Sequence, residues 1–139
     1  MKPKELMIGD WVNFLIDIEG GNTDYDPKVA QYQPMKIVSL SSWHNNDGEV
    51  ESAEGVINDI DQVKPIPLTD EILVKSGFRK QNNSSGVIKL DTYWLGEEFG
   101  FRIHSFETDY YQFGLAKIRY VHELQHALRL CGINKEIKL

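Results

Sequence analysis

The chain has 139 residues, of which 41% are hydrophobic and 11% aromatic, and it carries a formal net charge of −6 at pH 7. This length suits one domain or two very small ones, and the apolar content suffices for a core. No stretch approaches the roughly eighteen apolar residues of a membrane-spanning helix, and the N-terminus lacks the apolar run of a signal peptide. We therefore expect a cytoplasmic protein with no membrane segment.

The acidic balance disfavours nonspecific attraction to nucleic-acid backbones, although a local basic patch would still allow specific binding. The single cysteine, Cys131, excludes internal disulfides and falls on the apolar side of the last expected helix, so we expect it to be buried. Residues 47–61 are acidic and contain no lysine or arginine. They lack the spacing of a calcium loop, and we interpret them as a solvated connection.

The first half of the chain carries several short strand patterns joined by turns. A Gly-Asp turn at residues 9–10 leads into the first strand, and an Asn-Asn-Asp-Gly turn at residues 45–48 precedes the third. The expected strands cover residues 11–18, 35–40, 49–53 and 55–63. Residues 1–64 are thus predicted to form a curled antiparallel sheet or an SH3-like small barrel.

A proline-framed linker follows, because its two prolines remove backbone donors and hold the chain extended. Thr69 then offers an N-cap hydroxyl with two acidic residues behind it, and Gly77 offers a left-handed stop. A short helix is predicted over residues 69–77. It belongs to a second unit, residues 65–139, which either stands apart from residues 1–64 or joins them in one compact domain.

The rest of the chain is typical of an antiparallel meander. Phe101 and Ile103 alternate with Arg102 and His104, as in a sheet with one buried face. A helix predicted from about Lys117 to Cys131 covers that face, and the last four residues are expected either to form an edge strand or to fray. The predicted fold class is therefore α+β. The three meander strands are expected at residues 87–95, 99–106 and 110–115.

Eight aromatic residues lie within the 21 residues from 93 to 113, more than one sheet packed on one helix can bury. Some rings must therefore lie on the outer face, where they can stack bases or anchor a protein partner. The candidate binding residues are Arg102 and His104 on the polar face, near Tyr93 or Tyr111.

A zinc-hydrolase pattern begins at His122, where the chain reads His-Glu-Leu-Gln-His. In that interpretation His122 and His126 hold zinc and Glu123 is the general base. A third ligand is needed, and His104 or Asp109 would have to supply it.

The surrounding residues argue against this zinc site. Arg129 and Gly132 stand where the metzincin pattern requires a glycine and a further histidine. A helical wheel also predicts His122 and His126 on the solvent side of the helix, between arginines, where a dication is poorly placed. We therefore expect no metal and no catalytic residue, with the zinc hydrolase kept as an alternative.

Three segments form an unusual combination along the chain. They are residues 6–12, the PIPLT segment at 65–73 with Gly77 and Phe78, and the YVHELQ segment at 118–125. Together they resemble a family of small uncharacterised proteins from Bacteroides-like gut bacteria, often suspected of phage or mobile-element origin. The resemblance implies no activity. Members of that family often carry asparagine at the position of His126, which implies that this histidine is not a required ligand.

The predicted function is a non-enzymatic binding or accessory protein that uses a sheet or barrel surface to recognise a protein partner. Two alternatives stay open. One is the zinc-dependent hydrolase, and the other is a nucleic-acid-binding small-barrel protein, whose affinity would fall steeply with salt. No feature of the sequence specifies the oligomeric state.

Overall fold

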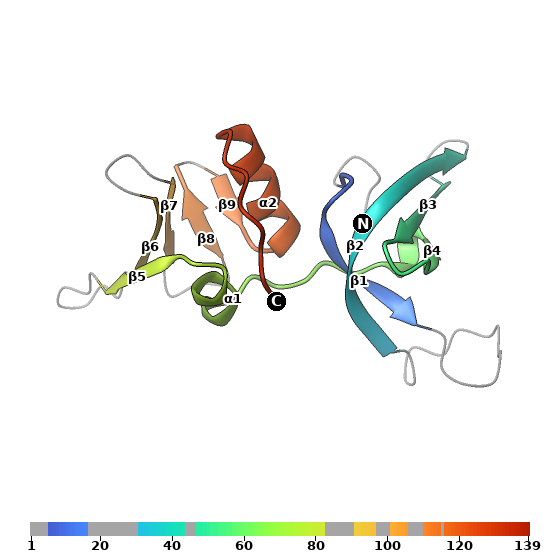
Figure 1. Cartoon of the computed structure of the whole chain (residues 1–139), viewed down its shortest axis with the longest axis horizontal. Coiled ribbons are helices and arrows are strands. Elements are labelled where there is room, and N and C mark those ends of the chain that lie inside the picture. Colours follow the sequence, from blue (N-terminus) through green and yellow to red (C-terminus); the bar gives the residue numbers. More distant parts are fainter. Residues whose placement is uncertain are drawn as a thin grey trace. The chain divides into compact units, whose positions relative to one another are not determined.

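The protein, seen in a computed structural model (Figure 1), has the predicted α+β fold and divides into two compact units, Met1–Ile66 and Pro67–Leu139. The structure describes residues 6–16, 31–43, 47–82, 91–96, 101–105, 110–114 and 116–139. The first half of the predicted turn at 45–48, the start of the strand expected at 87–95 and both ends of the strand expected at 99–106 lie outside these ranges. None of the helices within them is long and apolar enough to span a bilayer.

The first unit is one curled antiparallel sheet of four strands. In their order in the sheet they are β1 (Trp11–Ile16), β2 (Gln31–Trp43), β3 (Asp47–Ser52) and β4 (Ile57–Asp59). The long β2 pairs with β1 along its first half and with β3 along its second half. Its register shifts between Ile37 and Ser39, and such an irregularity bends a strand and increases its twist. The predicted curled sheet is confirmed.

Two sets of contacts bring the end of the first unit back to β1. After β4 the chain forms the 3-10 helix η2 (Ile60–Gln62), and Lys64 then exchanges two backbone hydrogen bonds with Asn13, of 2.8 and 3.0 Å. The buried Asn58 side chain accepts a hydrogen bond from the Leu15 amide (2.7 Å) and donates one to the Leu15 carbonyl (3.2 Å). Because both contacts join the end of the unit to its first strand, the curled sheet approaches a small barrel.

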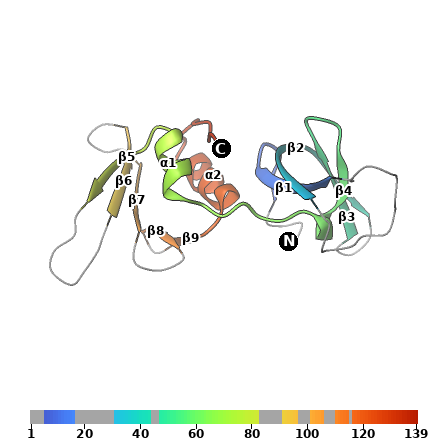
Figure 2. The ribbon, with the colours of Figure 1, turned by 90° about the horizontal axis from the view of Figure 1, so that it is seen from below.

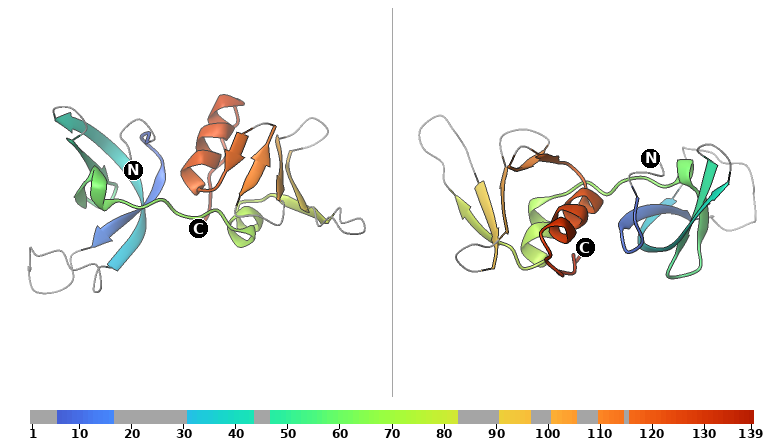
Figure 3. Two further views of the ribbon diagram at one scale, coloured as in Figure 1. Left: turned by 180° about the vertical axis from the view of Figure 1, so that it is seen from behind. Right: turned by 90° about the horizontal axis from the view of Figure 1, so that it is seen from above.

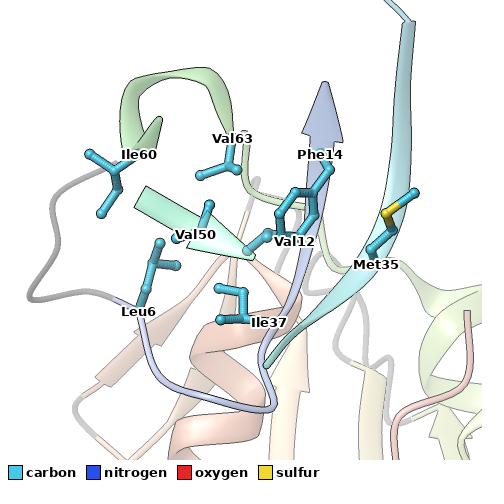
Figure 4. Packing of buried hydrophobic residues seen from close by; sticks show 8 residues of the cluster. All are labelled: Leu6, Val12, Phe14, Met35, Ile37, Val50, Ile60 and Val63. Carbon is cyan, nitrogen blue, oxygen red and sulfur yellow. The ribbon is translucent and has the colours of Figure 1, made fainter. Parts of the chain in front are cut away.

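Alternation along β1 separates the two sides of this sheet. Val12 and Phe14 are fully buried, whereas Trp11 and Asn13 are only partly buried. The buried side chains meet in one apolar core inside the curl (Figure 4). Its members are Leu6, Val12, Phe14, Met35, Ile37, Val50, Ile60 and Val63.

The second unit is built on a five-stranded antiparallel sheet. In their order in the sheet its strands are β5 (Arg79–Asn82), β6 (Asp91–Leu95), β7 (Phe101–Ser105), β8 (Tyr111–Phe113) and β9 (Ala116–Ile118). The three central strands are those of the predicted meander, and β5 and β9 extend it at both edges. The helices α1 (Asp70–Lys75) and α2 (Val121–Leu130) lie on the same side of this sheet (Figures 2 and 3).

The short helix predicted over residues 69–77 is confirmed as α1. Thr69 adopts an extended N-cap conformation, and its hydroxyl accepts a hydrogen bond from the Ile72 amide at 3.2 Å. Gly77 follows the helix with a φ of 95°, a left-handed conformation that glycine adopts without strain. Local capping thus specifies both ends of this helix.

The last helix is shorter than predicted. Instead of starting near Lys117, α2 begins at Val121, because residues 116–118 pair with β8 as a strand. Tyr120 is the N-cap and has an extended backbone, with a φ of −126°. Cys131 is the C-cap and is exposed, so the predicted burial of its thiol is wrong.

The C-terminal residues neither pair as an edge strand nor fray, so both expectations for them are wrong. Ile137 is 1% exposed. The backbone of Lys138 bonds to the hydroxyl of Ser76, the C-cap of α1, with the amide donating at 2.9 Å and the carbonyl accepting at 3.4 Å. One side chain of the first helix therefore holds the end of the chain against the second unit.

Candidate functional site

The zinc-hydrolase pattern occupies the first turns of α2, where Glu123 is engaged in capping the helix. Its Oε1 accepts hydrogen bonds from the backbone amides of Arg119 (2.9 Å) and Tyr120 (3.0 Å). These amides precede the helix, and a glutamate at the third helical position is a common partner for such donors. The carboxylate therefore has a structural role at the position where a hydrolase would need its general base.

His122 and His126 do not share a solvent-facing side as predicted. His122 is 4% exposed, and its ring is stacked on Tyr120 with centroids 5.9 Å apart and planes within 7°. The ring of His126 meets that of His122 edge-to-face at 5.7 Å. The prediction for His122 is wrong because α2 begins at Val121, one residue before this histidine. The His122 side chain therefore packs beside the N-cap residue Tyr120.

A metal site at this pattern would need a third ligand. No group of three or more His, Cys, Asp or Glu side chains within the described ranges is placed to hold a metal ion. His104, one suggested ligand, belongs to β7, and its Nδ1 lies 3.0 Å from the Thr92 hydroxyl. Asp109, the other, lies outside the described residues. The described contacts explain His122-Glu123-x-x-His126 as the capped and packed start of a helix.

The four predicted binding residues divide between the two sides of the second sheet. Tyr93 is 2% exposed, and its ring meets that of Tyr111 edge-to-face at 5.7 Å on the side of the helices. Arg102 and His104 flank the buried Ile103 and therefore lie on the opposite side. The sheet does not bring these four residues together into one site.

Tyr93 belongs to a polar cluster that joins α1 to the sheet. Its hydroxyl donates to the carboxylate of Asp70, which also pairs with Lys80 at 2.9 Å, while Asp91 lies 3.8 Å from the same ammonium. Burial, and then the bond to Asp70, raise the pKa of Tyr93, whereas that bond and Lys80 lower the pKa of Asp70. We interpret this cluster as a structural connection.

The sheet side that points away from α1 and α2 is the candidate recognition surface, called the outer face below. Strand register assigns side chains to it, because residues paired across strands lie on the same side. Two residues beside the strands, Tyr110 and Arg119, join it through ring contacts. The described members are Arg79, Gln81, Thr92, Trp94, Arg102, His104, Tyr110, Gln112, Lys117 and Arg119, of which Thr92 is buried beneath the surface. None of these described members is acidic.

A row of three paired residues crosses β5, β6 and β7 on the outer face. Trp94 is paired with Arg79 on one side and with Arg102 on the other. The Arg102 guanidinium lies 5.2 Å from the Trp94 ring centroid, and Arg79 donates to the Gly96 carbonyl at 2.9 Å. The partly exposed indole thus has the exposed Arg102 guanidinium against its ring and the exposed Arg79 as its paired neighbour on β5.

A second aromatic ring with basic neighbours lies at the other end of the outer face. The ammonium of Lys117 is 4.9 Å from the ring centroid of Tyr110, and the guanidinium of Arg119 is 5.9 Å from it. Both cations are exposed and the ring is partly exposed. His104, between the two groups, has its pKa lowered by burial and by the charge of Arg102, so its imidazole is neutral at pH 7.

Charge is segregated between the two units. Residues 1–66 carry five Lys or Arg against twelve Asp or Glu, whereas residues 67–139 carry ten against nine. All four arginines of the chain belong to the second unit. An open pocket of about 300 Å³, lined by Arg79, Lys80, Gln81 and Trp94, adjoins the β5 end of the outer face. The acidic formal charge of the whole chain therefore conceals a local basic surface.

Sequence reasoning found Arg102 and His104 but missed the residues around them. Arg79 lies on a four-residue strand whose side chains are all exposed, so no apolar alternation marked it. Lys117 and Arg119 were assigned to the helix, which hid their place on a sheet. The alternation of Trp94 with the buried Tyr93 was a usable signal for the central ring.

No family model, curated protein or solved structure matches this chain. The resemblance to the family from Bacteroides-like bacteria therefore stays a prediction, as does a phage origin. Any function assigned to the chain must rest on the chemistry of its own surfaces.

Proposed function

We propose that this chain is a non-enzymatic binding protein that recognises an anionic partner through the outer face of its second unit. The observation that carries the proposal is the row Arg79, Trp94 and Arg102, held on three adjacent strands of a face with no acidic member among its described residues. A cytoplasmic location, expected from the sequence, is part of the proposal.

The positions of the exposed apolar side chains in the second unit argue against an apolar interface on the outer face. Its large exposed hydrophobic residues, within the described ranges, are Val74, Leu130 and Leu139. None of the three belongs to the outer face. A partner on this face would therefore meet guanidinium, ammonium, amide and aromatic groups, which suit anionic ligands.

A nuclear magnetic resonance titration with a short heparin oligosaccharide, a polyanion without bases or peptide groups, tests this proposal. We expect shift changes at Arg79, Arg102 and the Trp94 indole, and none along α2. Arg102→Ala should weaken the titration, whereas Arg129→Ala, which removes the same charge from α2, should leave it unchanged. Absence of binding, or shift changes confined to residues 1–66, would contradict the proposal.

A further inference from the structure

Two rings on the outer face, Trp94 and Tyr110, each have two basic side chains beside them. Building on the proposed function, we infer that the anionic partner is a single-stranded nucleic acid. Its bases stack on the two rings, and its phosphates contact the surrounding arginines and lysine.

A nucleic-acid strand uses both kinds of group that this face presents. Single-strand binding proteins combine basic grooves that follow the backbone with aromatic rings on which bases stack. The planar guanidinium of Arg102, already against Trp94, is a further stacking surface. An acidic peptide would pair with the cations but would leave Trp94 and Tyr110 without a planar partner.

The positions of the two rings indicate a ligand several nucleotides long. Trp94 is on β6, Tyr110 adjoins β8, and the strand register offsets them by four residues. Strand spacing and rise per residue then separate the two positions by roughly 15 Å. One nucleotide cannot reach both rings, whereas a short single strand can.

Polar side chains on the outer face lie between the two rings. Gln81 and Gln112 present amides that both donate and accept, whereas the buried Thr92 hydroxyl is already engaged with His104 Nδ1 at 3.0 Å. The two amides can bond to base edges without favouring one sequence strongly. The face therefore suits a strand bound with little sequence preference.

An unpaired strand fits this face better than a duplex. In a duplex the bases are stacked on each other, and readers of the major groove insert a helix or a two-stranded ribbon. Here the contacts come from an open sheet face, on which splayed bases can stack.

The test is fluorescence anisotropy of labelled oligothymidylate and oligouridylate strands, titrated with the full chain at several salt concentrations. Three or four phosphate contacts predict that log K falls with log salt with a slope between about −2 and −3. A duplex of the same length should bind more weakly. Equal affinity for the duplex and the single strands would overturn the inference.

Variants assign the binding to the outer face. Arg102→Ala should weaken binding and reduce the salt slope by about 0.7, whereas Arg129→Ala on α2 removes an equal charge and should change neither. Tyr110→Leu should weaken binding roughly ten-fold, and Tyr110→Phe should restore it, because stacking needs the ring and not the hydroxyl. Circular dichroism checks that each variant is folded.

Polyglutamate and the heparin oligosaccharide, titrated in parallel, distinguish general anion binding, the proposed function, from binding of a single-stranded nucleic acid. If they bind with dependence on Arg102 and the oligonucleotides do not, nucleic-acid binding is overturned and the proposed function stands. If no probe binds, both are overturned. Oligonucleotide binding that is equally affected by Arg102→Ala and Arg129→Ala would place the site elsewhere and overturn the inference.

Discussion

The hydroxyl of the buried Tyr93 donates a hydrogen bond to the carboxylate of Asp70, which connects the first turn of α1 to a central strand of the second sheet. Because a bond to a charged acceptor is lost, Tyr93→Phe should lower the free energy of unfolding by about 1.5 to 3 kcal/mol. Urea unfolding measures this change. Tyr110→Phe, on the outer face, should cost less than about 0.5 kcal/mol. Equal losses of unfolding free energy in the two variants would contradict a stabilising hydrogen bond from Tyr93 to Asp70.

The same contact predicts a loss of stability at alkaline pH. Burial, and then the bond to Asp70, raise the pKa of Tyr93 above its ordinary value of 10.0, so the folded protein keeps a proton that the unfolded chain releases. The resulting stabilisation is complete below about pH 10 and is lost as the pH rises through the folded-state pKa. Tyr93→Phe should therefore flatten the decline in unfolding free energy above that pH. The pKa of Tyr111 is also raised by burial, so part of the decline should remain.

How well each element could be predicted depended on how local its determinants are. The ends of α1 are specified by Thr69 and Gly77, which act within one turn, and this helix was predicted correctly. The strand at residues 116–118 is specified by pairing with β8, and its sequence alone equally suits a helix. The burial of His122 depended in turn on the true start of α2. Contacts distant in sequence decided what local patterns could not.

The capping role of Glu123 can be tested through the stability of its variants. Glu123→Ala removes the acceptor for two backbone amides and should cost about 1 kcal/mol of unfolding free energy, as for other lost caps. Glu123→Gln keeps an acceptor at the same position and should cost less than half of that. Thermal and urea unfolding compare the two variants. A stability unchanged by both substitutions would contradict the capping role.

Asn58 provides the corresponding test in the first unit. Its amide bonds to both backbone groups of Leu15, so Asn58→Ala leaves two partly buried groups unpaired and should cost about 2 to 3 kcal/mol. Hydrogen exchange of the Leu15 amide should accelerate more than that of Val12 in the core. The exposed Asn134→Ala is the matched control and should change neither quantity. Unaltered protection at Leu15 would show that the amide does not join β4 to β1.

The outer face could be predicted only in part from the sequence, because the sequence does not specify the register between strands. Alternation along one strand assigned Arg102 and His104 to the polar side correctly. The partner of Arg102, however, is Trp94 on another strand, and no local pattern specifies which residues lie opposite each other. The row with Arg79 exists only once the sheet is assembled.

The C-terminal residues give a last prediction, since from the sequence we expected them either to form an edge strand or to fray. Ile137 is 1% exposed beside the backbone contact between Lys138 and Ser76, so Ile137→Ala should cost about 2 to 4 kcal/mol through the cavity it leaves. Leu139→Ala, at a side chain that is 37% exposed, should cost well under half as much. Urea unfolding measures the loss of unfolding free energy in each variant. Small and comparable losses in both would mean that the terminus frays. A large loss at Ile137 alone would identify the C-terminal segment as part of the core of the second unit.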